Sequence, residues 1–342
     1  MKKLLLVTNS HLNEINHLID AFKLKRDLIL NIEYLHKKDR NFSLLTRLFN
    51  KLRLPIDIDW LNVRILIQIL RNSPDIILIM KGNYIFPWLL RFIKKSNPQI
   101  KLVSWSGDNM FEKHNRSIYY TLGLKYYDKV FTTKSCNCDP SELKTLGAKK
   151  VIFHNKSYSK IFHKPCSNCD EISEKHDVLF IGYAEQDRFQ YMNYLAKNGI
   201  NIHIYGGGWD RGEYKFAHPN LIIHNKILVG EDYANALSCS KISLCFLRKA
   251  NRDLQTSRSI EIPACGGFMV AERTNEHLFL YSENEEAVFF ETKNELLNKV
   301  RYYLKHEHKR KSISKSGLRR TQKEDYSYEN RVDFILRKIN ES

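Results

Sequence analysis

The chain has 342 residues, and 55 Lys and Arg against 38 Asp and Glu give it a formal net charge of +17. That length exceeds one ordinary hydrophobic core, so two domains are expected. Hydrophobic residues make up 43% of the chain, with only 14 Gly and 8 Pro, which excludes a disordered or fibrous protein. Apolar runs are strand-sized, and the charged start lacks the apolar length of a signal peptide. We therefore expect a cytosolic protein, soluble or peripheral at the membrane.

The first half of the chain alternates short apolar runs with amphipathic stretches. This alternation is typical of a doubly wound parallel sheet. Helices are predicted over residues 12–25, 84–95 and 119–127. Strands are predicted over residues 3–8, 28–34, 75–80, 101–105, 129–133 and 149–153.

A polar, cysteine-bearing stretch over residues 154–176 interrupts this rhythm, which then restarts. Strands are predicted over residues 177–182, 201–205, 221–224, 242–246, 268–271 and 287–290. Helices are predicted over residues 187–198, 231–238, 253–264, 293–306 and 328–339. The expected fold class is α/β with two Rossmann-like domains. The expected boundaries are a first domain over 1–155, a linker over 156–176, a second domain over 177–325 and a terminal helix over 326–342.

The positive charge is concentrated in the first half. Residues 1–165 hold 29 Lys and Arg against 13 Asp and Glu, whereas the remainder holds 26 and 25. A basic half and a nearly neutral half indicate two modules with different partners, although a solvated lysine-rich surface explains the charge equally well.

Candidate binding residues follow the strands, because ligands of open parallel sheets bind beyond the carboxyl ends of the strands. Gly182 ends one strand, and Arg188 lies at the start of the next helix, where backbone amides can face a phosphate. A plain turn with a surface arginine is the alternative.

The segment over residues 249–268 is the most informative. Asp253 and Glu261 are separated by about two helical turns, which predicts that both carboxylates share one helix face. Arg258 lies within reach of that face. A carboxylate suits a ribose diol, a guanidinium suits a diphosphate, and a following glycine pair lets backbone approach a ligand closely.

Several stretches together carry a resemblance to a known family. They are Arg258–His277, Glu286–Phe290, Asp177–Gly182 and Ile204–Trp209, with Lys81–Gly82 and Trp105–Asn109 more loosely. These stretches resemble the CgeB-type spore-maturation glycosyltransferases, a branch of the GT-B glycosyltransferases. The resemblance implies two Rossmann-like domains facing a central cleft, the second binding a nucleotide-sugar donor and the first an acceptor. It implies no cofactor.

The resemblance also implies roles for the charged residues of the second domain. Glu261 takes the place of the second acid of an acid-x7-acid motif, which contacts the donor ribose, and Asp253 takes the place of the first acid, beside the transferred sugar. Tyr183 replaces an arginine directed at the diphosphate. Arg188 stands where the family has a lysine, and Arg258 is a candidate for the missing cation.

The glycines of the second domain complete the implied donor site. Gly206 and Gly207 are expected near the nucleotide base, and Gly266 and Gly267 in the turn behind the donor pocket. The acid pair leans towards a retaining reaction.

Three residues of the first half are candidates for the acceptor side. Asp108 is a candidate general base or acceptor-positioning residue, with a strand-end cap as the alternative. His11 follows the first strand and is expected to face the cleft. Lys81 is a candidate for an anionic acceptor or the donor phosphate. No metal site is expected, because charge on the leaving diphosphate can be stabilised by cations and helix N-termini.

Seven cysteines, an odd number, argue against a disulfide framework and fit a reducing compartment. Cys136, Cys138, Cys166 and Cys169 form two close pairs. These pairs can in principle bind one zinc ion, but reduced loop thiols are the preferred interpretation.

The leading hypothesis is a hexosyltransferase of polysaccharide biosynthesis that transfers sugar to a cell-envelope glycan, a lipid-linked oligosaccharide or a similar acceptor. The basic half then predicts an anionic acceptor or peripheral contact with an anionic membrane. A basic nucleic-acid-binding protein is the alternative from another class, although no nucleic-acid-binding signature is present. A non-catalytic protein of GT-B fold is a third.

Overall fold

A computed structural model describes residues 1–8, 13–35, 44–169, 176–212, 214 and 218–341. The chain divides into two compact units, which we name unit 1 (residues 1–155, 249–252 and 328–342) and unit 2 (residues 156–248 and 253–327). The stretch expected as a linker from residue 156 therefore belongs to unit 2, and the terminal helix belongs to unit 1. No helix in the described part of the chain combines the length and apolarity needed to cross a bilayer.

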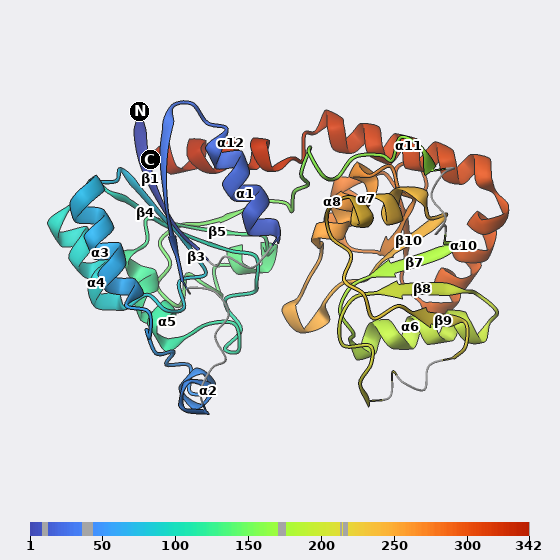
Figure 1. The fold of residues 1–342 in the computed structure, drawn as a ribbon, viewed down its shortest axis with the longest axis horizontal. Helices are drawn as coiled ribbons and strands as arrows, with labels where there is room; N and C mark the ends of the chain where they lie inside the picture. Colours follow the sequence, from blue (N-terminus) through green and yellow to red (C-terminus); the bar gives the residue numbers. More distant parts are fainter. Residues whose placement is uncertain (9–12, 36–43, 170–175, 213, 215–217, 342) are drawn as a thin grey trace. The chain divides into compact units, whose positions relative to one another are not determined.

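Unit 1 is built on a six-stranded parallel sheet in the order β2-β1-β3-β4-β5-β6 (Figure 1). The four central strands are buried along most of their length, as parallel strands covered on both faces are, whereas the edge strands β2 and β6 are mostly only partly buried. The six strands are β1 (Lys2–Thr8), β2 (Leu28–Tyr34), β3 (Ile76–Met80), β4 (Lys101–Ser106), β5 (Lys129–Thr132) and β6 (Val151–Phe153).

Helices cover both faces of the unit 1 sheet. Leucine and isoleucine side chains of α3 (Leu61–Asn72) and α4 (Pro87–Ser96) pack on one face with α5 (Ile118–Gly123). On the other face, α1 (Asn13–Lys23) packs beside α12 (Tyr328–Asn340), which returns from the end of the chain (Figure 1). The described part of unit 1 also contains α2 (Leu44–Lys51) and the short 3-10 helices η1 (Leu124–Tyr126) and η2 (Ser135–Cys138).

Unit 2 has a second six-stranded parallel sheet, in the order β12-β11-β10-β7-β8-β9. The strands are β7 (Val178–Ile181), β8 (Ile202–Tyr205), β9 (Leu221–Ile223), β10 (Ile242–Cys245), β11 (Met269–Glu272) and β12 (Val288–Phe290). The neighbouring strands β7 and β10 are far apart in the sequence, so the strand order reverses between them. Such a switch point is where open sheets bind ligands.

Both faces of this sheet are covered as well. On one face, α6 (Gln186–Lys197) and α10 (Lys293–Lys305) contribute to one hydrophobic core. On the other, α7 (Gly230–Cys239), α8 (Ser257–Ala264) and α9 (Asn275–Leu280) contribute to a second. The described helices of unit 2 also include α11 (Glu307–Lys323). Unit 1 carries 31 Lys and Arg against 16 Asp and Glu, and unit 2 carries 24 against 22.

All twelve predicted strands are present, and the predicted α/β class with two Rossmann-like domains is confirmed. The helix predicted over 253–264 is wrong at its start, because α8 begins only at Ser257. Thr256 and Ser259 form a reciprocal capping box there, which satisfies the first backbone amides and sets the N-terminal end of the helix. The sequence prediction also missed α2, α3, α9 and α11.

A loop from the second half of the sequence, residues 249–252, is part of unit 1. Buried Asn251 accepts a hydrogen bond from the amide of Asn109 at 2.9 Å. Arg252 pairs with the carboxylate of Glu142, which also accepts from Asn137 at 2.9 Å. These hydrogen bonds and this ion pair hold residues 249–252 against the loop that follows β4. A buried amide without a partner would destabilise that loop.

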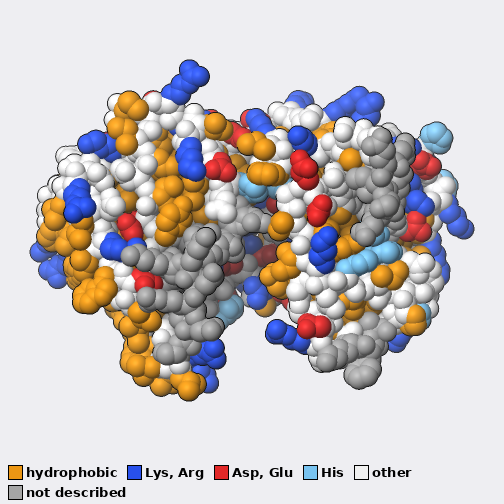
Figure 2. Space-filling view, viewed as in Figure 1, with side chains coloured by type: hydrophobic (Ala, Val, Ile, Leu, Met, Phe, Trp, Pro, Cys, Tyr) orange, Lys and Arg blue, Asp and Glu red, His pale blue; other side chains and the backbone are white. Residues whose placement is uncertain are grey.

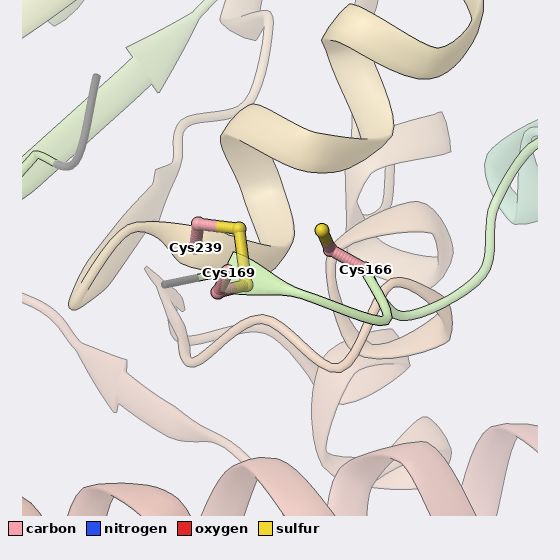
Figure 3. A group of neighbouring side chains, drawn as sticks. All are labelled: Cys166, Cys169 and Cys239. Carbon is pink, nitrogen blue, oxygen red and sulfur yellow. A yellow bond between two sulfur atoms is a disulfide. The ribbon is translucent and has the colours of Figure 1, made fainter. Parts of the chain in front are cut away.

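The expectation that all cysteines are reduced is wrong in this structure, because Cys169 and Cys239 form a disulfide across 70 residues of sequence (Figure 3). The third sulfur of this group, on Cys166, lies within 4.8 Å of both. Cys136 and Cys138 lie in unit 1, whereas Cys166 and Cys169 lie in unit 2. The sequence paired cysteines by spacing and therefore missed Cys239, which the fold brings to the same place.

Candidate functional site

Two glycines, Gly182 after β7 and Gly206 after β8, allow the carboxyl ends of these neighbouring strands to approach each other closely. Gly206 has φ of +135°, and a Cβ there would lie 2.1 Å from the carbonyl oxygen of Gly182. Only glycine fits so close a backbone approach. The indole nitrogen of Trp209 donates to the same carbonyl at 2.8 Å, so Trp209 anchors this glycine edge.

Two arginines lie over one aromatic ring beside these glycines. The guanidinium carbons of Arg188 and Arg258 are 5.9 and 5.6 Å from the centre of the Phe180 ring. A terminal nitrogen of Arg258 would be 3.4 Å from a Cβ on Gly182. The Nε atoms of both arginines are buried and make no hydrogen bond within the described residues. Such unsatisfied cationic donors suit a bound anion.

The two guanidinium groups repel each other. Burial lowers the pKa of Arg188, and the charge of Arg258 lowers it further. Glu185 and Asp253 act in the opposite direction on the same group, and Glu185 lies 3.5 Å from it. Asp253, predicted on the helix face of Glu261, lies instead in the loop before α8.

Glu261, on α8, is held by residues that the sequence did not point to. The hydroxyl of Tyr233, on α7, donates to Glu261 Oε2 at 2.6 Å. His163 Nε2 lies 3.8 Å from the other carboxylate oxygen, and burial lowers the pKa of His163 to about 4. The Glu261 side chain is 13% exposed, so a nearly buried carboxylate is positioned by hydrogen bonding.

A second buried histidine supports the start of α8. His277 Nδ1 donates to the carbonyl oxygen of Glu272 at 2.6 Å, and His277 Nε2 accepts from the Ser259 hydroxyl at 2.7 Å. Ser259 Oγ in turn accepts from the Thr256 amide at 3.0 Å. This chain fixes the helix start that carries Arg258.

The remaining residues predicted to bind the sugar donor lie at opposite edges of the unit 2 sheet. Tyr183 is 66% exposed, and its ring lies 2.7 Å from the position of a Cβ on Gly207. Gly266 and Gly267 precede β11 and therefore lie at the amino edge of the sheet, away from the carboxyl ends. A Cβ on Gly267 would lie 2.6 Å from the carbonyl oxygen of Leu237, so this glycine serves helix packing.

Unit 1 has its own cluster at the carboxyl ends of its strands. Lys81 follows β3, Asp108 follows β4, and the two form an ion pair. A cavity of about 180 Å³ adjoins Lys81. Its lining combines polar and apolar side chains, among them Thr8, Asn83, Val7 and Leu35. His11 lies outside the described residues.

Three residues of these sites were missed by sequence reasoning: Phe180, Tyr233 and His163. Phe180 is two residues before Gly182 on the same face of β7, a spacing visible in the sequence. Tyr233 and His163 carry no such signal, since only the tertiary fold brings Tyr233 of α7 and His163 of the segment before β7 to Glu261.

Residues 190–337 match a protein-family model described as glycosyl transferase-like. This match supports a glycosyltransferase but does not distinguish the CgeB type. No curated protein matches the chain.

Solved structures with the same fold cover nearly all of the chain. Sucrose-phosphate synthase from Thermosynechococcus elongatus is 10% identical with a TM-score of 0.70, covering 99% of both chains. HepE of Anabaena in complex with UDP is 13% identical with a TM-score of 0.65, covering 99% of this chain and 100% of HepE. An alpha-glucosyltransferase in complex with UDP-glucose and DNA is 15% identical with a TM-score of 0.67, covering 98% and 99%. The fold is therefore GT-B.

Proposed function

We propose that this protein is a glycosyltransferase of the CgeB-like type, which transfers a hexose from a nucleoside-diphosphate sugar to a saccharide or lipid-linked acceptor. One observation carries the proposal. Arg188 and Arg258 place two buried, unsatisfied guanidinium nitrogens beside the glycine edge of β7 and β8. Paired guanidinium groups match the oxygens of a diphosphate.

Unit 2 is the proposed donor site. Glu261 accepts hydrogen bonds from the ribose hydroxyls, with its orientation fixed by Tyr233. The glycine edge at Gly206 and Gly207 leaves room for the base. HepE is in complex with UDP and the glucosyltransferase with UDP-glucose, so UDP is the first nucleotide to test.

The reaction step needs stabilisation of the leaving diphosphate. Arg188 and Arg258 supply two positive charges where the negative charge develops. The proposal therefore needs no metal ion as cofactor. Asp253, whose charge reaches Arg188, takes the place beside the transferred sugar that the resemblance implies.

Unit 1 is the proposed acceptor site. In the Lys81–Asp108 pair, Asp108 accepts the acceptor hydroxyl proton or positions that hydroxyl, and Lys81 offers a cation to an anionic acceptor. The neighbouring cavity of about 180 Å³ has room for one sugar ring or part of a lipid chain. We retain His11 as a candidate on this side.

Unit 1 also has a surface that fits an anionic membrane at its cytoplasmic face. The helix α2 exposes Leu44, Leu45 and Leu48 by 53 to 86%, and Figure 2 shows hydrophobic side chains gathered around it. Two further helices expose apolar side chains to solvent: Val63, Ile67 and Leu70 on α3, and Trp88 and Phe92 on α4. Arg71, Arg91 and Lys95 are exposed on the same two helices. Exposed apolar groups interleaved with cations are suited to insert between anionic headgroups.

The donor assignment is tested by thermal unfolding with UDP, GDP, dTDP and CMP and their sugars. One nucleoside diphosphate is expected to raise the melting temperature of the wild-type chain, and Arg258→Ala is expected to abolish the shift. Arg211→Ala is the matched control, because Arg211 is 84% exposed on a loop of the same unit. Equal shifts in both variants would remove the arginine pair from the site.

Membrane contact is tested separately by co-sedimentation with vesicles. Binding to phosphatidylglycerol vesicles, but not to phosphatidylcholine vesicles, is expected, and Ile67→Glu with Phe92→Glu should weaken it. Unchanged sedimentation of this double variant would contradict the proposed surface.

Assays on the same protein distinguish two other functions from the proposed one. DNA is a second candidate acceptor, because unit 1 is basic and the similar glucosyltransferase is in complex with DNA. Salt-dependent binding to random DNA, with sugar transfer to it, would favour that acceptor. Nucleotide binding without sugar transfer or donor hydrolysis would favour a non-catalytic protein.

A further inference from the structure

Three histidines from the β7, β8 and β9 edge of the unit 2 sheet form a cluster that the proposed transfer reaction does not use. His176 lies two residues before β7, His203 lies within β8, and His224 directly follows β9. One ring nitrogen from each lies within 4.8 Å of the others.

The sheet register brings these side chains together. His203 pairs with Leu179 of β7, and it shares its face of β8 with Tyr205. The amide of His224 donates to the carbonyl oxygen of Ile204 at 3.0 Å, which extends the ladder by one residue beside Tyr205. His203 and His224 therefore lie on the face of the sheet that packs against α7 and α8, and His176 joins the cluster through its ring contact with His203.

The rings are stacked in sequence. The ring of His176 lies 3.9 Å from that of His203, and the ring of His224 lies 4.2 Å from that of Tyr205 with 3° between their planes. The Tyr205 hydroxyl lies 3.1 Å from His176 Nε2. These ring contacts within the cluster and with Tyr205 hold the three imidazoles close together without a ligand.

The ring nitrogens have the spacing of metal ligands. His203 Nδ1 and His224 Nε2 are 3.0 Å apart. Two imidazoles at a tetrahedral Zn²⁺ site, with Zn–N of 2.0 to 2.1 Å, have their nitrogens about 3.3 Å apart. The spacing of this pair is therefore within about 0.3 Å of the spacing that two zinc-bound imidazoles need. His176 is buried, whereas His203 and His224 are partly exposed. The cluster is therefore shielded from solvent at His176 and accessible to an ion at the other two histidines.

We propose that His176, His203 and His224 bind one divalent transition-metal ion, Zn²⁺ by preference, with water in the fourth position. Three imidazoles are borderline-soft ligands, which suit Zn²⁺ and not Mg²⁺ or Ca²⁺. The ion links the strands β7, β8 and β9, and none of the residues assigned to the donor holds it. Its role is to stabilise this edge of the sheet, where β8 leads directly into the turn at Gly206.

The test uses the full chain without a histidine tag, freed of metal and titrated with ZnCl₂ by calorimetry. One equivalent is expected to bind. His203→Ala is expected to weaken this binding at least roughly 10-fold, in line with the loss of one ligand. His224→Gln keeps a polar side chain of similar size and provides a second variant with less effect on folding, and circular dichroism checks both. His308→Ala is the matched control, because His308 is exposed on α11.

The cysteine group of Cys166, Cys169 and Cys239 becomes a competing site for zinc once its disulfide is reduced, and CoCl₂ distinguishes the two sites. Co²⁺ bound by imidazoles is expected to show visible absorption without the strong near-ultraviolet bands of thiolate ligation, and Cys169→Ser is expected to leave the spectrum unchanged. Wild-type affinity in both histidine variants, or loss of binding in Cys169→Ser, would overturn the proposal. Nucleotide-induced thermal shifts, measured on the same samples, report on the donor site independently.

Discussion

The hydroxyl of Tyr233 donates a 2.6 Å hydrogen bond to the carboxylate of Glu261, whose side chain is only 13% exposed. Burial, with the negative charge of Glu261 beside it, raises the pKa of Tyr233 well above its ordinary value. The tyrosine therefore stays protonated and acts as a fixed donor to the carboxylate.

Tyr233→Phe is expected to weaken nucleotide binding without removing it. The carboxylate loses one hydrogen bond and its fixed orientation, for which the expected loss is about 1 kcal/mol, or roughly 5-fold in affinity. Glu261→Ala is expected to abolish binding. Calorimetric titration of the nucleotide that gives the largest thermal shift measures both. A Glu261→Ala variant that binds like the wild type would contradict the ribose assignment.

Stability is expected to fall as the pH falls from 6.5 to 4, because His277 is buried and neutral. Burial lowers the pKa of His277 from 6.5 to about 4. In this interval the unfolded chain binds more protons than the folded one, so stability present above pH 6.5 is lost on acidification. At about 1.4 kcal/mol per pH unit, the loss from this group is roughly 3 kcal/mol.

Urea unfolding at pH 7.5, 6 and 5 measures this loss. His277→Gln should be less stable at pH 7.5, since the bonds to Glu272 and Ser259 are disturbed, and should show a shallower pH dependence than the wild type. His163, with a pKa of about 4, contributes in the same direction and remains in this variant. The exposed His308→Ala should follow the wild type. An identical pH slope in His277→Gln and wild type would exclude His277 as the titrating group.

Gly206→Ala is expected to be among the most damaging substitutions in unit 2. The new Cβ would lie 2.1 Å from the Gly182 carbonyl oxygen, so β7 and β8 must separate at their carboxyl ends. A loss of at least about 3 kcal/mol in unfolding free energy is expected, together with loss of the nucleotide-induced thermal shift.

Gly199→Ala is the matched control, because Gly199 also has a positive φ but a Cβ there meets nothing within 4 Å. Its expected loss is only about 1 to 2 kcal/mol, the backbone cost of a left-handed alanine. Equal losses in the two variants would show that conformation, and not the close backbone approach, explains the requirement for glycine at position 206.

Reduction of the Cys169–Cys239 disulfide is expected to lower the melting temperature. The bond closes a loop of 70 residues, for which restriction of the unfolded chain gives about 2 to 4 kcal/mol. Cys239→Ser should melt at the lower temperature with or without reductant. Cys136→Ser, which alters a free thiol of unit 1, should keep the response to reductant. A wild-type protein that melts identically in both buffers would show that this bond does not stabilise the fold.

The strands were predictable from the sequence alone. A parallel strand covered on both faces is a short apolar run, such as Ile76–Met80 or Val178–Ile181, and such runs are visible without any tertiary information. The surface helices were less predictable. In α3, Val63, Ile67 and Leu70 are exposed although they are apolar, so the apolar pattern does not follow the buried face alone.

The site could be predicted only as far as single residues at strand ends. Gly182, Arg188, Arg258 and Glu261 were identified from their types and their places after strands or on a helix. Asp253 lies outside α8, because the capping box at Thr256 starts the helix only at Ser257. The spacing of the two acids did not show that these local side-chain hydrogen bonds set the helix start.

The sequence by itself determined the α/β class, the two sheets and the uneven charge, because these depend on local apolar periodicity and on composition. Only the tertiary structure decided which side chains meet. Arg188 joins Arg258 over Phe180, Tyr233 holds Glu261, and Cys169 bonds to Cys239. These pairs depend on a strand order that places β7 beside β10 and on helices packed against the same sheet, and neither is encoded in the spacing of residues along the chain.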